Sequence, residues 1–141
     1  MSKKAGVIIS VFLVIALALS AVSLYFGISA LNSKEENRDV QYVLYLGTND
    51  KDTDKPVFAP DKAKEEAEKI LLEHFGGYTI QEANGGWVDG EKIYREYTLV
   101  IYLSDTDIES VHAACDEMIQ VFNQSSVLIQ ANKTSTEFYA G

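Results

Sequence analysis

The sequence predicts an α+β domain of the ferredoxin-like type, in which two helices cover one face of a four-stranded antiparallel sheet, preceded by one N-terminal transmembrane helix. Two observations carry this prediction. After residue 39, strand and helix patterns follow one another in the order β-α-β-β-α-β, the split β-α-β pattern, for which right-handed crossovers favour this topology. Residues 5–31 carry no charge. The length of 141 residues, 47% of them hydrophobic, indicates one globular domain.

The uncharged N-terminal segment is long enough to cross a bilayer. A helix of about 20 apolar residues spans the ~30 Å hydrocarbon core. Lys3 and Lys4 precede the segment, and positive flanks stay on the cytoplasmic side. The predicted organisation is a cytoplasmic N-terminus at residues 1–4, a transmembrane helix or signal anchor at 5–31, a linker at 32–39 and an extracytoplasmic domain at 40–141.

A cleaved signal peptide is the alternative interpretation of this segment. Small residues at 16–18 and 21–23 offer cleavage sites. The apolar character continues past both of them, through Leu24 and Ile28, which favours a retained anchor in the cell membrane. Cleavage would give a secreted protein, so both interpretations export the domain.

Charge and cysteine content exclude several classes of function. The chain has 12 basic and 21 acidic residues, for a net charge of −9, and every acidic residue follows residue 31. We expect no nucleic-acid partner, because phosphate backbones repel a domain with this much negative charge. The single Cys115 excludes an intramolecular disulfide and a Cys-rich metal site. No cofactor is predicted.

The first half of the domain reads as a strand followed by a helix. Residues 40–46 are rich in β-branched and aromatic side chains, which is typical of a strand. Pro60 and Asp61 begin a helix, since Pro is favoured in the first turn. Apolar residues recur at helical spacing up to Phe75. Gly76 and Gly77 then end the helix.

A β-hairpin is predicted next, with strands at residues 78–88 and 91–103 joined by a turn at Asp89-Gly90. The paired glycines Gly85-Gly86 suggest a bulge or a close backbone approach. Alternation assigns the side chains of the second strand to two faces. One face carries Ile93, Arg95, Tyr97, Leu99, Ile101 and Leu103, and the other carries Tyr94, Glu96, Thr98, Val100 and Tyr102.

The last elements are a helix from Ile108 to Phe122, capped by the acidic segment 104–107, and a strand at residues 127–138. Because both helices lie on one face, the other face of the sheet is left open. The strands are dense in aromatic residues, namely Tyr42, Tyr45, Tyr78, Trp87, Tyr94, Tyr97 and Tyr102. An exposed aromatic face indicates a ligand, a partner or a second copy of the sheet.

One stretch resembles a known family. Its parts are the Gly77-Tyr-Thr start of the second strand, Gly86-Trp87, the hairpin Gly90, and Arg95-Glu96. With the first strand and helix, residues 40–103 are similar to a family of small exported bacterial domains of unknown function. The resemblance implies a ferredoxin-like fold and export from the cell. It implies no activity.

The predicted ligand-binding or partner-binding group is Trp87, Tyr94, Arg95 and Glu96, with Tyr45. The hairpin turn brings the first four close together. Arg95 has the fork geometry that grips a carboxylate, and Glu96 is the candidate base. The more common arrangement is a Trp packed on the sheet beside a cross-strand charge pair.

Two other motifs are weaker. Residues 50–54 have the Asp-x-Asp-x-Asp spacing of a calcium loop, but Lys55 and Asp61 replace the Gly and Glu that the loop requires. A solvated acidic loop is therefore favoured. His112 and Cys115 are helix neighbours that would form a nucleophilic pair. A buried structural Cys is favoured because Cys115 belongs to the apolar stripe. No metal site is predicted.

The favoured function is a membrane-anchored extracytoplasmic binding or interaction domain that uses its open aromatic sheet face and is not an enzyme. Its predicted partners are the lipid bilayer through residues 5–31, and a second copy or an envelope protein through the sheet. One alternative is a small metal-independent enzyme formed as a dimeric α+β barrel, with Glu96, Arg95 or a tyrosine in an enclosed cavity. Another is a structural subunit of a bacterial envelope complex.

Overall fold

The computed structural model describes residues 19–28 and 40–141. They belong to two compact units, one ending at Glu36 and the other beginning at Asn37. Residues 19–28 are helical. Within the two described ranges, no helix is long and apolar enough to cross a membrane. The predicted cytoplasmic segment 1–4 and linker 32–39, and most of the predicted membrane helix 5–31, lie outside the described residues.

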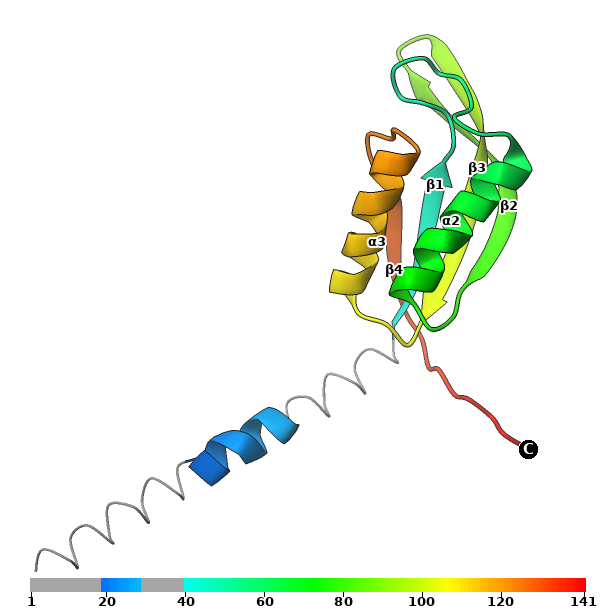
Figure 1. Cartoon of the computed structure of the whole chain (residues 1–141). Coiled ribbons are helices and arrows are strands. Elements are labelled where there is room, and N and C mark those ends of the chain that lie inside the picture. The colour runs from blue at the N-terminus through cyan, green and yellow to red at the C-terminus, as the bar shows by residue number, and fades with distance from the viewer. Residues whose placement is uncertain (1–18, 29–39) are drawn as a thin grey trace, which may run out of the picture. The chain divides into compact units, whose positions relative to one another are not determined.

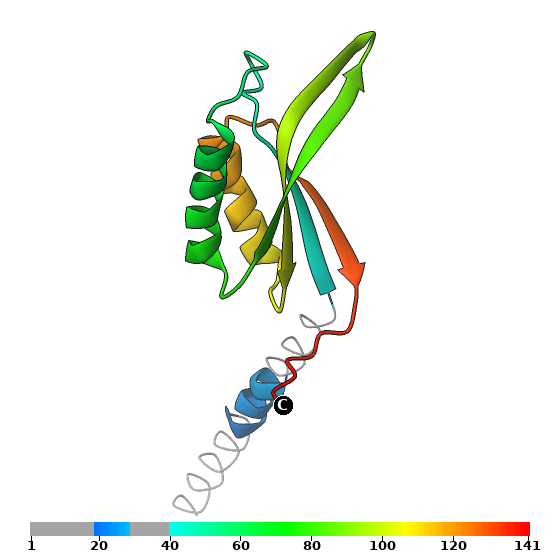
Figure 2. The same cartoon turned by 90° about the vertical axis from the view of Figure 1, so that its right-hand side faces the viewer.

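The second unit is an α+β domain with the predicted order of elements (Figure 1). The strands pair antiparallel throughout, in the spatial order β2-β3-β1-β4, and both long helices cover the same face of the sheet (Figure 2). The split β-α-β arrangement is therefore confirmed. The elements are β1 (Val40–Gly47), α2 (Pro60–His74), β2 (Thr79–Asp89), β3 (Lys92–Ser104), α3 (Ile108–Val121) and β4 (Leu128–Lys133).

The hydrophobic core lies between the sheet and the two helices. Alternate residues of β1 and β3 face the helices, and Leu44, Leu46, Leu99 and Ile101 are fully buried there. Each helix buries one apolar face, as its sequence predicts. The buried residues within the helices are Ala63, Ala67, Ile70 and Leu71 from α2, and Val111, Cys115 and Met118 from α3, to which the structure adds Ala114. Among residues 40–141, no helix covers the opposite face of the sheet.

The two helices begin differently. In α3, the carboxylate of Asp107 accepts a hydrogen bond from the backbone N–H of Ser110 at 2.7 Å, as an N-cap residue does. That bond lowers the pKa of Asp107. In α2, Pro60 occupies the first turn, and the preceding Ala59 provides no side-chain cap. Only α3 therefore has the side-chain cap that the acidic segment before it predicts.

Two details of the predicted strands are wrong, and one open alternative is decided. The last strand ends at Lys133 rather than at residue 138. The hairpin turn is Gly90-Glu91, because Asp89 pairs with Lys92, and Gly90 supplies the positive φ of +59° that favours glycine in this turn. No bulge interrupts β2, whose pairing with β3 is continuous from Thr79 to Asp89. The other predicted role of the paired glycines, a close approach by the neighbouring strand, is the one found, since a Cβ on Gly86 would stand 3.2 Å from the carbonyl oxygen of Tyr94.

Candidate functional site

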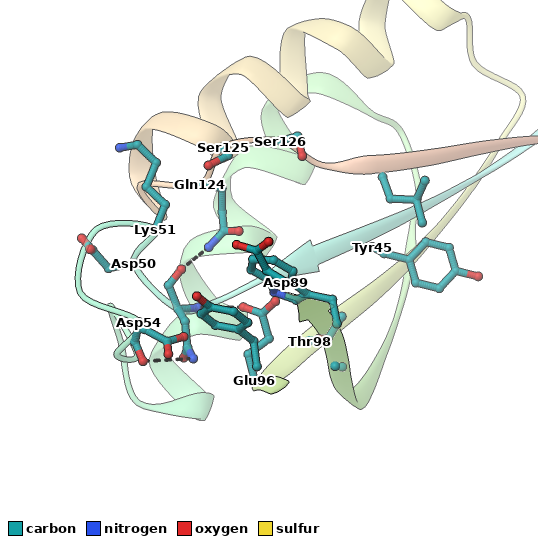
Figure 3. A pocket seen from close by; sticks show the side chains of 17 residues that line it. Tyr45, Asp50, Lys51, Asp54, Asp89, Glu96, Thr98, Gln124, Ser125 and Ser126 are labelled. Atoms are coloured by element: carbon teal, nitrogen blue, oxygen red, sulfur yellow. Dashed lines mark hydrogen bonds between the residues drawn. The ribbon is translucent and has the colours of Figure 1, made fainter. Parts of the chain in front are cut away.

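The open face of the sheet carries a pocket of about 760 Å³. It lies where the hairpin of β2 and β3 approaches two loops, residues 48–57 after β1 and residues 124–127 after α3. In Figures 1 and 2, the loop after β1 and the tip of the hairpin lie at the same end of the domain. Figure 3 shows Asp54, Asp89, Glu96 and Gln124 near the centre of this pocket, whereas Tyr45, Asp50 and Lys51 lie at its edge and point away from the centre. The pocket therefore combines segments that are far apart in the sequence.

Two glycines form the floor of this pocket. The carboxylate of Glu96 lies against Gly47 so closely that a Cβ atom added there would stand 2.7 Å from its Cδ. In the same way, the hydroxyl of Thr98 occupies the space that a Cβ of Gly85 would need. Because Gly47 on β1 and Gly85 on β2 have no side chains, the side chains of Glu96 and Thr98 can lie close against the neighbouring strands. The space above them stays hollow as a result.

Glu96 is the charged group at the centre of the floor. Its Oε2 atom accepts a hydrogen bond from the backbone N–H of Asn49 at 3.1 Å. The side chain is partly buried, and within residues 19–28 and 40–141 it forms no ion pair with a Lys, Arg or His. A carboxylate in such a position attracts a cation, because its own negative charge is not compensated nearby.

One wall of the pocket is an aromatic stack. The rings of Trp87 and Tyr94, cross-strand partners on β2 and β3, lie parallel with centroids 4.1 Å apart and an interplanar angle of 4°. The ammonium of Lys92 stands 3.9 Å from the centroid of the Tyr94 ring. It also pairs with Asp54 at 3.1 Å. Lys92 thus connects the hairpin to the loop after β1, and the Asp54 carboxylate raises the pKa of Lys92.

The opposite wall is the loop after β1, which is held by the segment that follows α3. The carboxylate of Asp50 accepts hydrogen bonds from the backbone N–H groups of Asp52 and Thr53 and from the side-chain amide of Asn123. These bonds, with Asn123 as the largest contributor, lower the pKa of Asp50 to about 2. The side-chain amide of Gln124 donates to the carbonyl oxygen of Asn49. Both contacts hold the loop in place over the sheet.

The lining of the pocket is acidic. Asp50, Asp54, Asp89 and Glu96 contribute carboxylates, and Lys51 is the one basic residue among the lining side chains. Lys51 is engaged with Asp52 and Asn123. Within the described ranges, no group of three or more His, Cys, Asp or Glu side chains is arranged to hold a metal ion. The loop with calcium-like spacing instead uses Asp50 to bind its own backbone.

The structure brings together four of the five predicted site residues. Tyr45, Trp87, Tyr94 and Glu96 line the pocket. Arg95 does not, because it alternates to the other face of β3, where its side chain is exposed. The expected cross-strand charge pair is also wrong, since the partners of Arg95 and Glu96 on β2 are Gly86 and Gly85.

The weaker candidate pair on α3, His112 and Cys115, does not form a nucleophilic site, because one side chain is exposed and the other is buried. Cys115 is buried in the core, and burial raises the pKa of its thiol to about 11. His112, one turn earlier, is exposed. A thiol with that pKa is protonated at neutral pH and is therefore a poor nucleophile.

Sequence reasoning missed three contributors to the pocket, namely Gly47, Asn49 and Gln124. Gly47 carries the one signal that was available, because a glycine at the end of a predicted strand indicates close backbone approach. Asn49 and Gln124 are polar loop residues, and only the tertiary contact between their loops reveals their role.

Comparisons with known proteins bear on the fold alone. No protein-family model and no curated protein matches the sequence. Among solved structures, the chain is similar to a phage SAM lyase in complex with S-methyl-5'-thioadenosine, with a TM-score of 0.56 and 16% identity, covering 69% of this chain and 82% of that one. It is also similar to a phage SAM lyase in the apo state, with a TM-score of 0.50 and 15% identity, covering 72% of this chain and 92% of that one.

Proposed function

We propose that this domain binds a small cationic ligand in the pocket on its open sheet face. The observation that carries the proposal is the Glu96 carboxylate, which lies on the pocket floor with one backbone hydrogen bond and no cationic partner among the described residues. A ligand cation placed above it would gain a charge-assisted contact in a partly dehydrated site. The volume of about 760 Å³ falls in the usual range for small-molecule sites.

The acidic lining of the pocket also favours a positively charged ligand. Asp50, Asp54 and Asp89 surround the floor, so a phosphate or carboxylate ligand would face several like charges and one lysine. Such an arrangement concentrates cations and repels anions. The proposed ligand therefore has a sulfonium, quaternary ammonium or protonated amine rather than a phosphate group.

The experiment is calorimetric titration of the full chain, purified in mild detergent, with trimethylsulfonium and with choline. We expect saturable binding that weakens as salt is raised. Glu96→Gln keeps the shape of the side chain and removes its charge, so this variant should bind each cation far more weakly. Glu73→Gln on the exposed side of α2 makes the same charge change away from the pocket. Equal affinity in both variants would contradict the proposal.

The proposed location of this domain is the outer side of a cell membrane, where residues 5–31 would hold it. The uncharged sequence of that segment and the preceding Lys3 and Lys4 support this location. Membrane fractionation followed by protease treatment of intact cells tests it. A domain that stays with the membrane and is digested from outside fits, whereas protection from protease would contradict it.

A second candidate is an enzyme that acts on S-adenosylmethionine. Its support is the similarity of fold to the phage SAM lyase, together with the unpaired Glu96 in a pocket of sufficient size. Incubation of the full chain with S-adenosylmethionine, followed by mass spectrometry, tests whether S-methyl-5'-thioadenosine is released. Turnover that Glu96→Gln abolishes would favour this candidate, and the absence of turnover with retained binding would leave the binding function.

A further inference from the structure

We propose that the ligand of this pocket carries a flat ring as well as its cationic centre, and that the ring stacks on Trp87. This inference rests on the proposed function, since it concerns the same pocket. It names the class of the ligand: a nucleoside or other heteroaromatic ring joined by a short linker to a sulfonium or ammonium group. Three features of the pocket lead to this class.

The first feature is the open face of the stack. Tyr94 has no free ring face, because Trp87 covers one side at 4.1 Å and the ammonium of Lys92 stands 3.9 Å from the same centroid. A spacing of 4.1 Å between parallel rings leaves no room for an ammonium, so Lys92 lies on the other side. The remaining aromatic surface is the indole of Trp87, which lines the pocket and is 51% exposed.

The second feature is the rigidity of that indole. Trp87 is backed by Tyr94, and Tyr94 is held in turn by Lys92 and Asp54. A ring that is already fixed in place loses little conformational freedom when a second ring stacks on it. Stacking of a base on such an aromatic platform tightens binding by about tenfold. The exposed indole is therefore suited to hold a flat ring.

The third feature is the spacing between the stack and the charge. Trp87 pairs with Tyr94, and Glu96 is two residues further along β3 on the same face. Diagonal neighbours of this kind on adjacent strands lie about 7–8 Å apart. The ring and the cationic centre of the ligand should be separated by a similar distance. Nucleotides do not fit this class of ligand because their phosphates are anionic. Simple quaternary amines do not fit it because they have no ring to stack on Trp87.

Trp87 is the single tryptophan of the chain, so its emission reports on stacking directly. The full chain is titrated with four probes: S-adenosylmethionine, which has a ring and a sulfonium; S-methyl-5'-thioadenosine, which has a neutral ring; trimethylsulfonium, which has no ring; and ATP, which is anionic. We expect S-adenosylmethionine to quench the emission and to bind on the order of tenfold more tightly than trimethylsulfonium. ATP should not bind.

Variants separate this inference from the proposed function. In Trp87→Leu, calorimetry should show that the advantage of S-adenosylmethionine over trimethylsulfonium is lost while trimethylsulfonium still binds, and Trp87→Phe should restore part of the advantage. Val88→Thr, a change on the adjacent exposed residue of the other face, is the matched control. Equal affinities of the two cations for the unmodified chain, with unchanged emission, would overturn the inference and leave the proposed function standing. Failure of both cations to bind would overturn both.

Discussion

The ring of Tyr94 lies parallel to the indole of Trp87, at a centroid distance of 4.1 Å and an interplanar angle of 4°. The pair is formed by cross-strand partners on the open face of the sheet, just before the hairpin turn. Both side chains line the pocket, and the ammonium of Lys92 covers the ring face of Tyr94 that Trp87 leaves uncovered. The predictions below follow from this wall and from the floor beside it.

Lys92→Met should strengthen the binding of a cationic probe such as trimethylsulfonium. The change removes a positive charge near the pocket and uncovers one face of Tyr94, which can then contact a cation. Thermal stability should change little, because the Lys92–Asp54 pair is exposed on both sides. Calorimetric titration measures the affinity. Lys64→Met on α2, which also removes an exposed ion pair, is the control, and equal affinity in the two variants would contradict the prediction.

Gly85→Ala should destabilise the domain by about 1–3 kcal/mol, the usual cost of overpacking. The new methyl group would meet the buried, β-branched Thr98, whose side chain cannot move aside freely. Urea unfolding followed by circular dichroism measures the loss. The double variant Gly85→Ala with Thr98→Ala should recover part of it. Additive losses in the double variant would show that the two residues do not interact.

Gly47→Ala should affect binding more than stability. Its methyl group would meet the carboxylate of Glu96, which is the end of a flexible side chain and can swing away. The swing raises Glu96 into the pocket and breaks its bond to the N–H of Asn49. We expect weaker binding of trimethylsulfonium with a nearly unchanged unfolding midpoint. Gly77→Ala, where the added atom meets nothing, is the control. Unchanged binding in Gly47→Ala would contradict the prediction.

The loop after β1 should keep its attachment to the segment that follows α3 down to low pH. Hydrogen bonds lower the pKa of Asp50 from 3.8 to about 2. Because the pKa is lower in the folded state, the stabilisation is complete above pH 3.8 and is lost as the pH falls through about 2. An NMR titration of the carboxyl carbon measures this pKa. Asn123→Gly removes the amide and accepts the positive φ of 45° at that position, so it should raise the pKa of Asp50. An unchanged value would show that Asn123 is not the cause.

Cys115 should resist alkylation in the folded protein. The thiol is buried, and its pKa is raised to about 11, so it has neither access to reagent nor appreciable thiolate at neutral pH. Mass spectrometry after treatment with iodoacetamide should show no modification in buffer and one modification in guanidinium chloride. Rapid labelling in buffer would show that α3 opens readily.

The predicted elements agree with the structure because each depends on which side chains are buried. The helical stripe that includes Ala67 and Leu71, and the alternation through Leu99 and Ile101, each require one face toward the core. The alternation also placed Tyr94 and Glu96 on one face of the second hairpin strand, and both line the pocket. Trp87 was added because the hairpin brings the two strands close together, and the structure pairs it with Tyr94 on the same face.

The rest of the site could not be predicted because it depends on contacts across long stretches of chain. Asn123 binds the carboxylate of Asp50 from 73 residues away in the sequence, and no local sequence pattern predicts that contact. Arg95 was grouped with Glu96 by proximity, although consecutive strand residues point to opposite faces. The hairpin turn was placed one residue early because Asp-Gly and Gly-X pairs both favour tight turns.

The four-stranded sheet separates the residues of the hydrophobic core from the residues of the pocket. The buried residues that stabilise the fold, such as Leu44 and Ile101, belong to the helix-covered side, whereas Tyr45, Glu96 and Trp87 belong to the other side. Exposed pocket side chains such as Trp87 can therefore change without disturbing the core, whereas the pocket floor at Gly85 and Thr98 is tightly packed. Under the proposed function, changes at the hairpin tip and in the two loops would alter ligand preference, while the residues on the helix-covered face would go on specifying the fold.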